Sequence, residues 1–137
     1  MDLETQTRGQ MERTLSQRVQ ALYRTQLGQQ PSRVQCQIFD GKVVIVLEDS
    51  ITKTEQVLVA NGQKNLAEQV RDDLDKAFNP QLTQLIQEVI GIEVVDVLTD
   101  ATLKTGRMGT IAVLADTPSF VNLKALAKLR ATQVQKT

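Results

Sequence analysis

The feature that most constrains the fold of this chain is a hairpin pattern in its first third. Val34, Cys36 and Ile38 alternate with polar residues, which is the period of a strand with one apolar face. Asp40-Gly41 follows, a pair that tolerates the positive φ angles of a type I′ turn. Residues 43–47 are then aliphatic without a break, as is typical of a central strand covered on both faces. The pattern therefore predicts two antiparallel strands within a larger sheet.

A helix is predicted before this hairpin, from about Thr5 to Leu27. Its apolar residues recur at helical spacing, while charged and amide side chains occupy the remaining positions. Gly28 is a natural helix stop, and Pro31 lies just past it. The apolar stripe consists of Met11, Leu15, Val19 and Leu22. One face of this helix is therefore expected to pack on the sheet.

Two more helices are predicted after the hairpin. Thr52 and Glu55 have the spacing of a capping box, so a short helix should run from Thr52 to about Ala60. A longer helical segment follows, from Gln63 to Ile90. Pro80 lies inside it and lacks the N–H of a helical hydrogen bond, so we expect a kink or a restart with Asn79 as N-cap. The stripe of this segment comprises Leu66, Val70, Leu74, Phe78, Leu82, Leu85, Ile86, Val89 and Ile90.

A second pair of strands and a last helix complete the pattern. A polar connection joins the two strands, which are marked by Ile92, Val94 and Val97 and by Met108, Ile111 and Val113. A final, moderately amphipathic helix is predicted from Phe120 to about Val134, after Pro118. The order is thus helix, hairpin, helix, helix, hairpin, helix.

This order predicts an α+β fold. An isolated hairpin is marginally stable in water, so the two hairpins should join one antiparallel sheet with helices on one face, a two-layer sandwich. Residues 1–116 are expected to form this single domain, and residues 117–137 a basic, moderately amphipathic helical tail. The second face of the sheet must be solvated or covered by another subunit. The aliphatic run 43–47 favours a cover, and we therefore predict a homodimer.

The charge distribution bears on the possible partners. The chain of 137 residues has 16 basic and 16 acidic residues, and only 3% of it is aromatic. This balance and the lack of an aromatic stacking platform argue against nucleic-acid binding. The charges are unevenly distributed along the chain. The segment after Asp116 has four basic residues and no acidic one, so the residues before it carry an equal excess of acidic groups. The tail residues Phe120, Leu123, Lys124, Leu126 and Lys128 are therefore candidate contacts with an acidic membrane or a partner groove, the alternative being that the tail packs on the acidic body.

The composition argues against catalysis. Histidine is absent and Cys36 is the single cysteine, so neither a histidine acid–base group nor a zinc site is expected. Cys36 lies in the apolar phase of a strand and is expected to be a buried, unreactive thiol. Asp72, Asp73 and Asp75 are interpreted as a solvated helix face. No phosphate-binding loop or nucleophile motif occurs, so we expect no enzyme and no cofactor.

The densest polar cluster lies at the turn between the last two predicted strands. It offers weak candidates for ligand or partner binding, with ordinary turn chemistry as the alternative. The candidates are Thr99, Asp100, Lys104, Thr105, Gly106 and Arg107, with Asp96 nearby. The polar segment from Met1 to Arg13 does not resemble a signal peptide, and a free thiol suits a reducing compartment. We therefore expect a cytoplasmic protein, with at most peripheral contact to the cytoplasmic membrane.

Several stretches together resemble the MpsC-like family, formerly catalogued as a domain of unknown function. The resemblance covers roughly residues 5–115 and leaves the basic tail outside. It rests on Val34, Phe39-Asp40-Gly41, Gln69-Val70-Arg71, Pro80, Gly91-Ile92-Glu93-Val94-Val95, Leu98-Thr99-Asp100 and Lys104-Thr105-Gly106-Arg107. Members often carry glutamate at the position of Arg107, so a partner contact there would differ in this chain.

The resemblance implies a function that the residues alone do not. Its family is named for a sodium-translocating, membrane-potential-generating system linked to inorganic-carbon uptake, and no catalytic residue can be carried over from it. It therefore implies a non-enzymatic accessory or regulatory partner of a membrane ion or bicarbonate transporter in a bacterial cell. The alternative is a dimeric small-molecule sensor with its ligand at the subunit interface, near Asp100 to Arg107.

Overall fold

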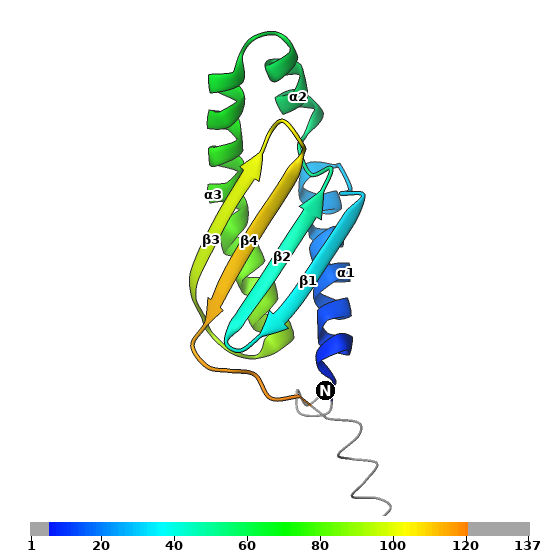
Figure 1. The fold of residues 1–137 in the computed structure, drawn as a ribbon, viewed down its shortest axis with the longest axis vertical. Helices are drawn as coiled ribbons and strands as arrows, with labels where there is room; N and C mark the ends of the chain where they lie inside the picture. The colour runs from blue at the N-terminus through cyan, green and yellow to red at the C-terminus, as the bar shows by residue number, and fades with distance from the viewer. Residues whose placement is uncertain (1–5, 121–137) are drawn as a thin grey trace, which may run out of the picture.

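The computed structural model describes residues 6–120 and has two helices packed on one side of a four-stranded antiparallel sheet (Figure 1). In chain order the elements are α1 (Arg8–Leu27), β1 (Arg33–Phe39), β2 (Lys42–Glu48), α2 (Lys53–Ala60), α3 (Lys64–Ile90), β3 (Val94–Thr102) and β4 (Arg107–Leu114). The predicted α+β class and the joining of two hairpins in one sheet are confirmed. The last predicted helix, after Phe120, lies outside the described residues.

The strand order is β1-β2-β4-β3, so β2 and β4 are the central strands. Each hairpin pairs internally, and the antiparallel pairing of β2 with β4 joins the two hairpins. The aliphatic run 43–47 therefore lies in the middle of the sheet, as predicted. Its long-range partner, the segment 108–112, follows it by more than sixty residues in the sequence.

The turn of the first hairpin differs from the prediction in one respect. Phe39 pairs with Lys42, so the loop has the two residues expected, Asp40 and Gly41. Asp40 has a φ of 51°, but Gly41 is not in the left-handed region. A type I′ turn requires positive φ at both residues, so this part of the prediction is wrong.

Helix α1 is closed at both ends by residues that its sequence supplies. Thr7 accepts a hydrogen bond from the Gln10 amide, and the Gln10 side chain accepts one from Thr7, which makes a capping box. Gly28 ends the helix in the left-handed conformation, with a φ of 68°. The buried face consists of Met11, Leu15, Val19 and Tyr23. Tyr23 thus takes the buried place predicted for Leu22, which is only half-buried.

Helix α3 runs through Pro80 without a break, so the predicted restart at Asn79 is wrong. Asn79 does not cap a helix; its side-chain oxygen accepts a hydrogen bond from the Thr99 hydroxyl of β3, at 3.3 Å. Phe78 and Leu82, on either side of the proline, are buried in the core. The packing of these side chains outweighs the one hydrogen bond that the exposed proline removes.

The two faces of the sheet have different surroundings. Helices α1 and α3 cover the inner face (Figure 1). The buried apolar side chains of that face are Cys36, Ile38, Val43, Ile45, Leu47, Met108, Ala112 and Leu114. No element of residues 6–120 covers the outer face, on which Val44 and Val46 are half-buried and Leu98 is exposed. The expectation that strand 43–47 is covered on both faces is therefore not met within the described chain.

Helix α2 is unusual because its only buried residue is Glu55. The α2–α3 hairpin projects beyond the ends of the strands (Figure 1). An amphipathic face is the usual reason why a short helix stays docked. Here the buried carboxylate of Glu55 keeps α2 docked, because it forms an ion pair with Arg71 of α3.

Candidate functional site

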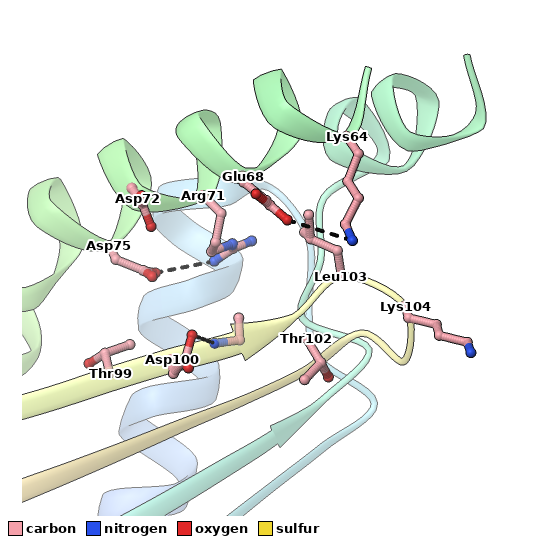
Figure 2. A pocket seen from close by; sticks show the side chains of 11 residues that line it. Lys64, Glu68, Arg71, Asp72, Asp75, Thr99, Asp100, Thr102, Leu103 and Lys104 are labelled. Atoms are coloured by element: carbon pink, nitrogen blue, oxygen red, sulfur yellow. Dashed lines mark hydrogen bonds and ion pairs between the residues drawn. The ribbon is translucent and has the colours of Figure 1, made fainter. Parts of the chain in front are cut away.

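A polar hollow of about 420 Å³ lies between α3 and the end of β3 (Figure 2). Lys64, Arg71 and Asp75 line it from the helix. Asp100 and Lys104 line it from the strand and from the turn that follows. The hollow mixes both signs of charge, and its deepest side chain is Arg71, of which only 5% is exposed.

Arg71 forms a buried ion pair with Glu55 of α2. Its Nε lies 2.8 Å from Glu55 Oε2, and its Nη2 lies 2.5 Å from Glu55 Oε1, a two-pronged geometry. Glu55 is fully buried. Arg71 also donates to Asp75 Oδ1, at 3.4 Å, and to the Ser50 carbonyl, at 3.4 Å. The guanidinium is therefore engaged by α2, by its own helix and by the segment after β2.

The protonation of this cluster follows from its burial and its charges. Burial alone would lower the pKa of Arg71, but the hydrogen bond and the charge of Glu55 outweigh it and raise the pKa. Burial raises the pKa of Asp75, against the opposing charge of Arg71. Burial likewise raises the pKa of Tyr23. Arg71 therefore stays protonated and charged, so it can hold a geometry but does not release a proton near neutral pH.

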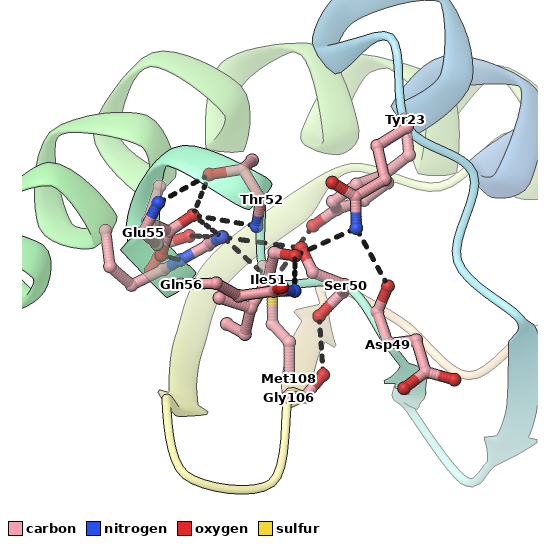
Figure 3. A network of polar contacts seen from close by, with 12 residues as sticks. Tyr23, Asp49, Ser50, Ile51, Thr52, Glu55, Gln56, Gly106 and Met108 are labelled. Atoms are coloured by element: carbon pink, nitrogen blue, oxygen red, sulfur yellow. Dashed lines mark hydrogen bonds and ion pairs between the residues drawn. The ribbon is translucent and has the colours of Figure 1, made fainter. Parts of the chain in front are cut away.

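The same network fixes the turn between β3 and β4 (Figure 3). Ser50 donates to the Gly106 carbonyl from its backbone N–H, at 3.0 Å, and from its hydroxyl, at 3.2 Å. Gly106 has a φ of 75°, a conformation that side chains disfavour. Met108 Sδ accepts from the Tyr23 hydroxyl, at 3.1 Å, and from Arg71 Nη1, at 3.7 Å. The contacts join α1, α3 and β4 to the segment between β2 and α2.

The structure brings together only part of the predicted site. Thr99 and Asp100 lie at the polar hollow with Lys104. Thr105 and Arg107 instead line a second hollow, of about 410 Å³, on the outer face of the sheet. Asp100 borders both hollows. Because successive residues of a strand point to opposite faces, one stretch of sequence serves two separate surfaces.

Most of these predicted residues have structural partners. The Thr99 hydroxyl lies 3.2 Å from that of Thr110, and Thr105 hydrogen-bonds Thr102. Arg107 Nε donates to Glu48 Oε1 at 3.0 Å. These contacts agree with the alternative of ordinary turn chemistry.

The aspartates of β3 protect the edge of the sheet. Asp96 accepts from the Val97 amide, at 3.0 Å, and Asp100 from the Ala101 amide, at 2.8 Å. An edge strand has amides that no neighbouring strand pairs, and these invite association with other chains. The opposite edge is closed in a similar way, because Glu12 of α1 accepts from the Ile38 amide at 2.7 Å.

Cys36 is buried on the inner face, as predicted. Burial raises the pKa of its thiol to about 11, and the charge of Glu12 adds to the effect while a hydrogen bond with Ser16 opposes it. A thiol with a pKa this high is almost entirely protonated near neutral pH. Its environment is that of a small apolar residue and not that of a nucleophile.

The pair Glu55–Arg71 is the feature that sequence reasoning missed. The sequence predicts a capping box for Glu55, and this box does form, since Glu55 Oε1 accepts from the Thr52 amide at 3.2 Å. For Arg71 the sequence offers only its place in a family pattern. The one available signal was an arginine beside Val70 and Leu74, on the apolar side of a helix. Of the neighbouring aspartates, Asp72 and Asp73 are exposed as expected, but Asp75 is half-buried.

Between residues 6 and 120 no cluster of three or more histidine, cysteine, aspartate or glutamate side chains is placed to bind a metal ion. Within the same range no helix has the length and apolarity needed to cross a bilayer. Of the tail candidates only Phe120 is described; its ring lies 5.7 Å from Arg8 Cζ. Leu123, Lys124, Leu126 and Lys128 lie outside the described residues.

The fold and the site define a class: a small two-layer α+β protein with a buried ion pair at one end of the sheet and an open outer face. The chain belongs to the MpsC family, described as a Na⁺-translocating membrane potential-generating system, whose model matches residues 7–116. The family resemblance inferred from the sequence is thereby confirmed. Neither the curated proteins nor the solved structures gave a match.

Proposed function

We propose that this protein is a non-enzymatic accessory or regulatory component of a membrane ion and inorganic-carbon transport system, acting in the cytoplasm by protein–protein contact. The observation that carries the proposal is the family match over residues 7–116, whose description names a Na⁺-translocating membrane potential-generating system. The link to inorganic carbon comes from the family resemblance of the sequence.

The chemistry of the polar hollow supports contact over catalysis. Arg71 is held by Glu55 and Asp75, and its raised pKa keeps it charged. No buried side-chain nitrogen or oxygen in the part of the chain that the structure describes lacks a hydrogen-bond partner. The sequence has no histidine to transfer a proton near neutral pH. Arg71 and its partners are therefore arranged to hold α2, α3 and the segment after β2 in place.

The exposed apolar side chains supply surfaces for such contact. Val57 and Leu66 are exposed at the projecting α2–α3 hairpin, Val57 to 58%. Leu98 and Ile111 are exposed on the outer face of the sheet. Apolar side chains grouped on a surface are typical of protein-interaction sites. The projecting hairpin is well placed to reach a membrane protein while the sheet remains free.

Affinity capture from membranes tests the proposal. The full chain with an affinity tag is incubated with detergent-solubilised membranes of its own cells, and bound proteins are identified by mass spectrometry. We expect an integral membrane transport protein to be retained by the wild type and depleted by Val57→Asp combined with Leu66→Asp. The matched control is Gln26→Asp, an exposed position on α1. A chain lacking residues 117–137 shows whether the tail contributes.

A cellular measurement completes this test. Sodium-dependent bicarbonate uptake is compared in cells with and without the gene, with wild-type chain or the Val57/Leu66 variant restored. Uptake that depends on the wild type and is not restored by the variant supports the proposal. Unchanged uptake without the gene, together with no membrane protein retained in the capture, contradicts it.

A second candidate function is the dimeric small-molecule sensor. The observation that favours it is the hollow of about 410 Å³ on the outer face, which is lined by the predicted residues Asp100, Thr105 and Arg107. Thermal-shift screening with nucleotides and bicarbonate tests it, because a ligand at a hundredfold excess over Kd stabilises the folded state by about 2.7 kcal/mol. The shift should disappear in Arg107→Ala. Absence of a shift with every compound rejects this candidate.

A further inference from the structure

The outer face of the sheet carries an apolar row that crosses three strands. In the strand register Val44 of β2 pairs with Ile111 of β4, and Ile111 pairs with Leu98 of β3. Ile111 is 40% exposed and Leu98 is 54% exposed. One face of an antiparallel sheet is often solvated, but then its outward positions are mostly polar. This row instead leaves aliphatic side chains in water at the centre of the sheet.

A hollow lies directly beside the row, over Gly109. In the register Gly109 pairs with Val46 on one side and Asp100 on the other. A Cβ atom built on Gly109 would meet nothing within 4 Å. The hollow measures about 490 Å³, and Val44, Val46 and Leu98 contribute to its walls. A glycine in a strand interior weakens the strand and commonly marks the close approach of another molecule.

The charges around the apolar row suit a second copy of the same surface. The outward positions of the strands carry three basic residues, Arg33, Lys42 and Arg107. They also carry three acidic residues, Glu48, Asp96 and Asp100. The face is thus neutral as a whole, so contact between two copies is not opposed by net repulsion. A strongly charged partner would find no complementary field here.

We infer that this face binds the same face of a second copy, with Val46 of each chain entering the hollow over Gly109 of the other. A two-fold axis parallel to the strands places β2 of one copy over β4 of the other and keeps residues at the same height along the strands opposite one another. Because Val46 and Gly109 are register partners and so lie at the same height, the Val46 side chain of one chain faces the hollow over Gly109 of the other. The same axis places Glu48 over Arg107 of the second copy. Aligned packing of two sheets is common in β-sandwiches.

The size of the face indicates a weak dimer. Four strands spaced at about 4.8 Å, with about seven residues each at about 3.4 Å, cover roughly 450 Å² per copy. Two copies would bury on the order of 900 Å², which is below the range of stable standard interfaces and within that of transient ones. We therefore expect monomer and dimer to exchange as the protein concentration changes. This inference does not depend on the transport role.

The test is sedimentation equilibrium of the full chain over a range of concentrations. We expect the wild type to dimerise, and both Gly109→Val and Leu98→Lys to weaken the dimer at least about tenfold. The extra side chain of Gly109→Val has open space in the monomer, so the folded monomer should be retained. The matched control is Val57→Lys, which replaces an exposed apolar residue away from the sheet. Thermal unfolding at monomer concentrations confirms that each variant folds.

A cross-linking experiment tests the arrangement itself. A chain with Glu48→Cys is mixed with a chain with Arg107→Cys, which leaves the hollow over Gly109 intact, and a short bismaleimide reagent should yield a covalently linked pair. A mixture of Glu48→Cys with Val57→Cys should not. The buried native thiol Cys36 is common to all chains and serves as background.

Three results would overturn the inference. The first is a wild-type chain that stays monomeric at millimolar concentration. The second is a dimer that Gly109→Val and Leu98→Lys leave unchanged, because another surface would then form it. The third is a monomer whose membrane-protein capture is lost in Gly109→Val. That last result assigns the face to the transport partner and leaves the proposed function intact.

Discussion

Of the ion pairs in residues 6–120, the pair between Arg71 and Glu55 is the most deeply buried. Both side chains are buried, and their contact is two-pronged. Removing water from two charges costs as much as their attraction returns, so the pair adds little net stability as a unit. Removing one partner leaves the other charge buried and unpaired. The pair thus fixes where α2 sits more than how stable the fold is.

Arg71→Met should therefore lower the free energy of unfolding by about 3–5 kcal/mol, measured by urea denaturation. Arg18→Met is the matched control, because Arg18 forms an exposed pair with Glu88, and solvent screening makes the loss of such a pair cost far less. Adding Glu55→Leu to Arg71→Met should recover much of the loss. Equal effects of the two arginine substitutions would contradict this account.

Cys36 should show the pH profile of a buried thiol. Because its pKa rises from the usual 9.0 to about 11, the folded protein holds this proton more tightly than the unfolded chain. At pH 8 the thiolate fraction falls about a hundredfold, so alkylation by iodoacetamide should be at least about tenfold slower than in denaturant. The contribution of Cys36 to stability is complete below pH 9 and is lost as the pH rises towards about 11. A reaction rate equal to that in denaturant would show an exposed thiol.

Among the elements, α3 shows how packing overrides a local rule. Proline is poorly tolerated in a helix interior, yet Pro80 lies inside a helix of 27 residues. Its ring is exposed, while Phe78 and Leu82 hold the helix on the sheet. The loss of one hydrogen bond is small beside the burial of these two side chains, each worth about 1.5–3 kcal/mol.

Pro80→Ala should then raise the free energy of unfolding by about 1 kcal/mol or more, because alanine restores the backbone donor and favours the helix. Chemical denaturation followed by circular dichroism measures the change. Gln81→Ala, at the next exposed position, is the control and should shift stability only slightly. If Pro80→Ala destabilises the protein, the proline instead sets a curvature that the sheet contacts require.

The edge strands explain why the predicted polar cluster looked like a site. Asp96 and Asp100 lie close in the sequence to the turn of the second hairpin, among other polar residues. In the structure each accepts the amide of the residue that follows it, on an edge strand. Acidic side chains at an edge discourage pairing with other sheets. Both side chains therefore have a structural role at the edge, and Asp100 in addition borders both hollows.

At the scale of the whole molecule, stability is unevenly distributed. Strands β2 and β4 pair on both sides, whereas β1 and β3 are edges and α2 has one buried residue. Regions with few buried contacts open at low free-energy cost. The α2–α3 hairpin, which also carries the exposed Val57 and Leu66, therefore has its weakest part at the projecting end.

Amide hydrogen exchange should report this order. We expect amides of β2 and β4 to exchange slowest and those of α2 to exchange at least about a hundredfold faster. Arg71→Met should accelerate exchange in α2 before it affects the central strands. The profile is measured by NMR or mass spectrometry at concentrations where the chain is monomeric. Equal protection of α2 and β2 would mean that α2 is held by more than the ion pair.

For residues 6–120, the sequence by itself determined the elements and their order. Alternation in 34–38, the aliphatic run 43–47 and the glycine stop at Gly28 are local patterns, and each forms the predicted structure. A strand or helix period acts over neighbouring residues, so it can be read without knowing the fold. The family resemblance rests on the same ordered stretches and is confirmed over residues 7–116.

Only the tertiary structure decided how those elements use their side chains. It paired β2 with β4, joined Arg71 to Glu55 sixteen residues away, and carried α3 through Pro80. It also left Leu98 and Ile111 exposed beside the hollow over Gly109. Each of these outcomes depends on contacts between segments distant in the sequence. The free energy of such contacts comes from the burial of side chains, and a short stretch of sequence does not show which side chains the folded chain buries.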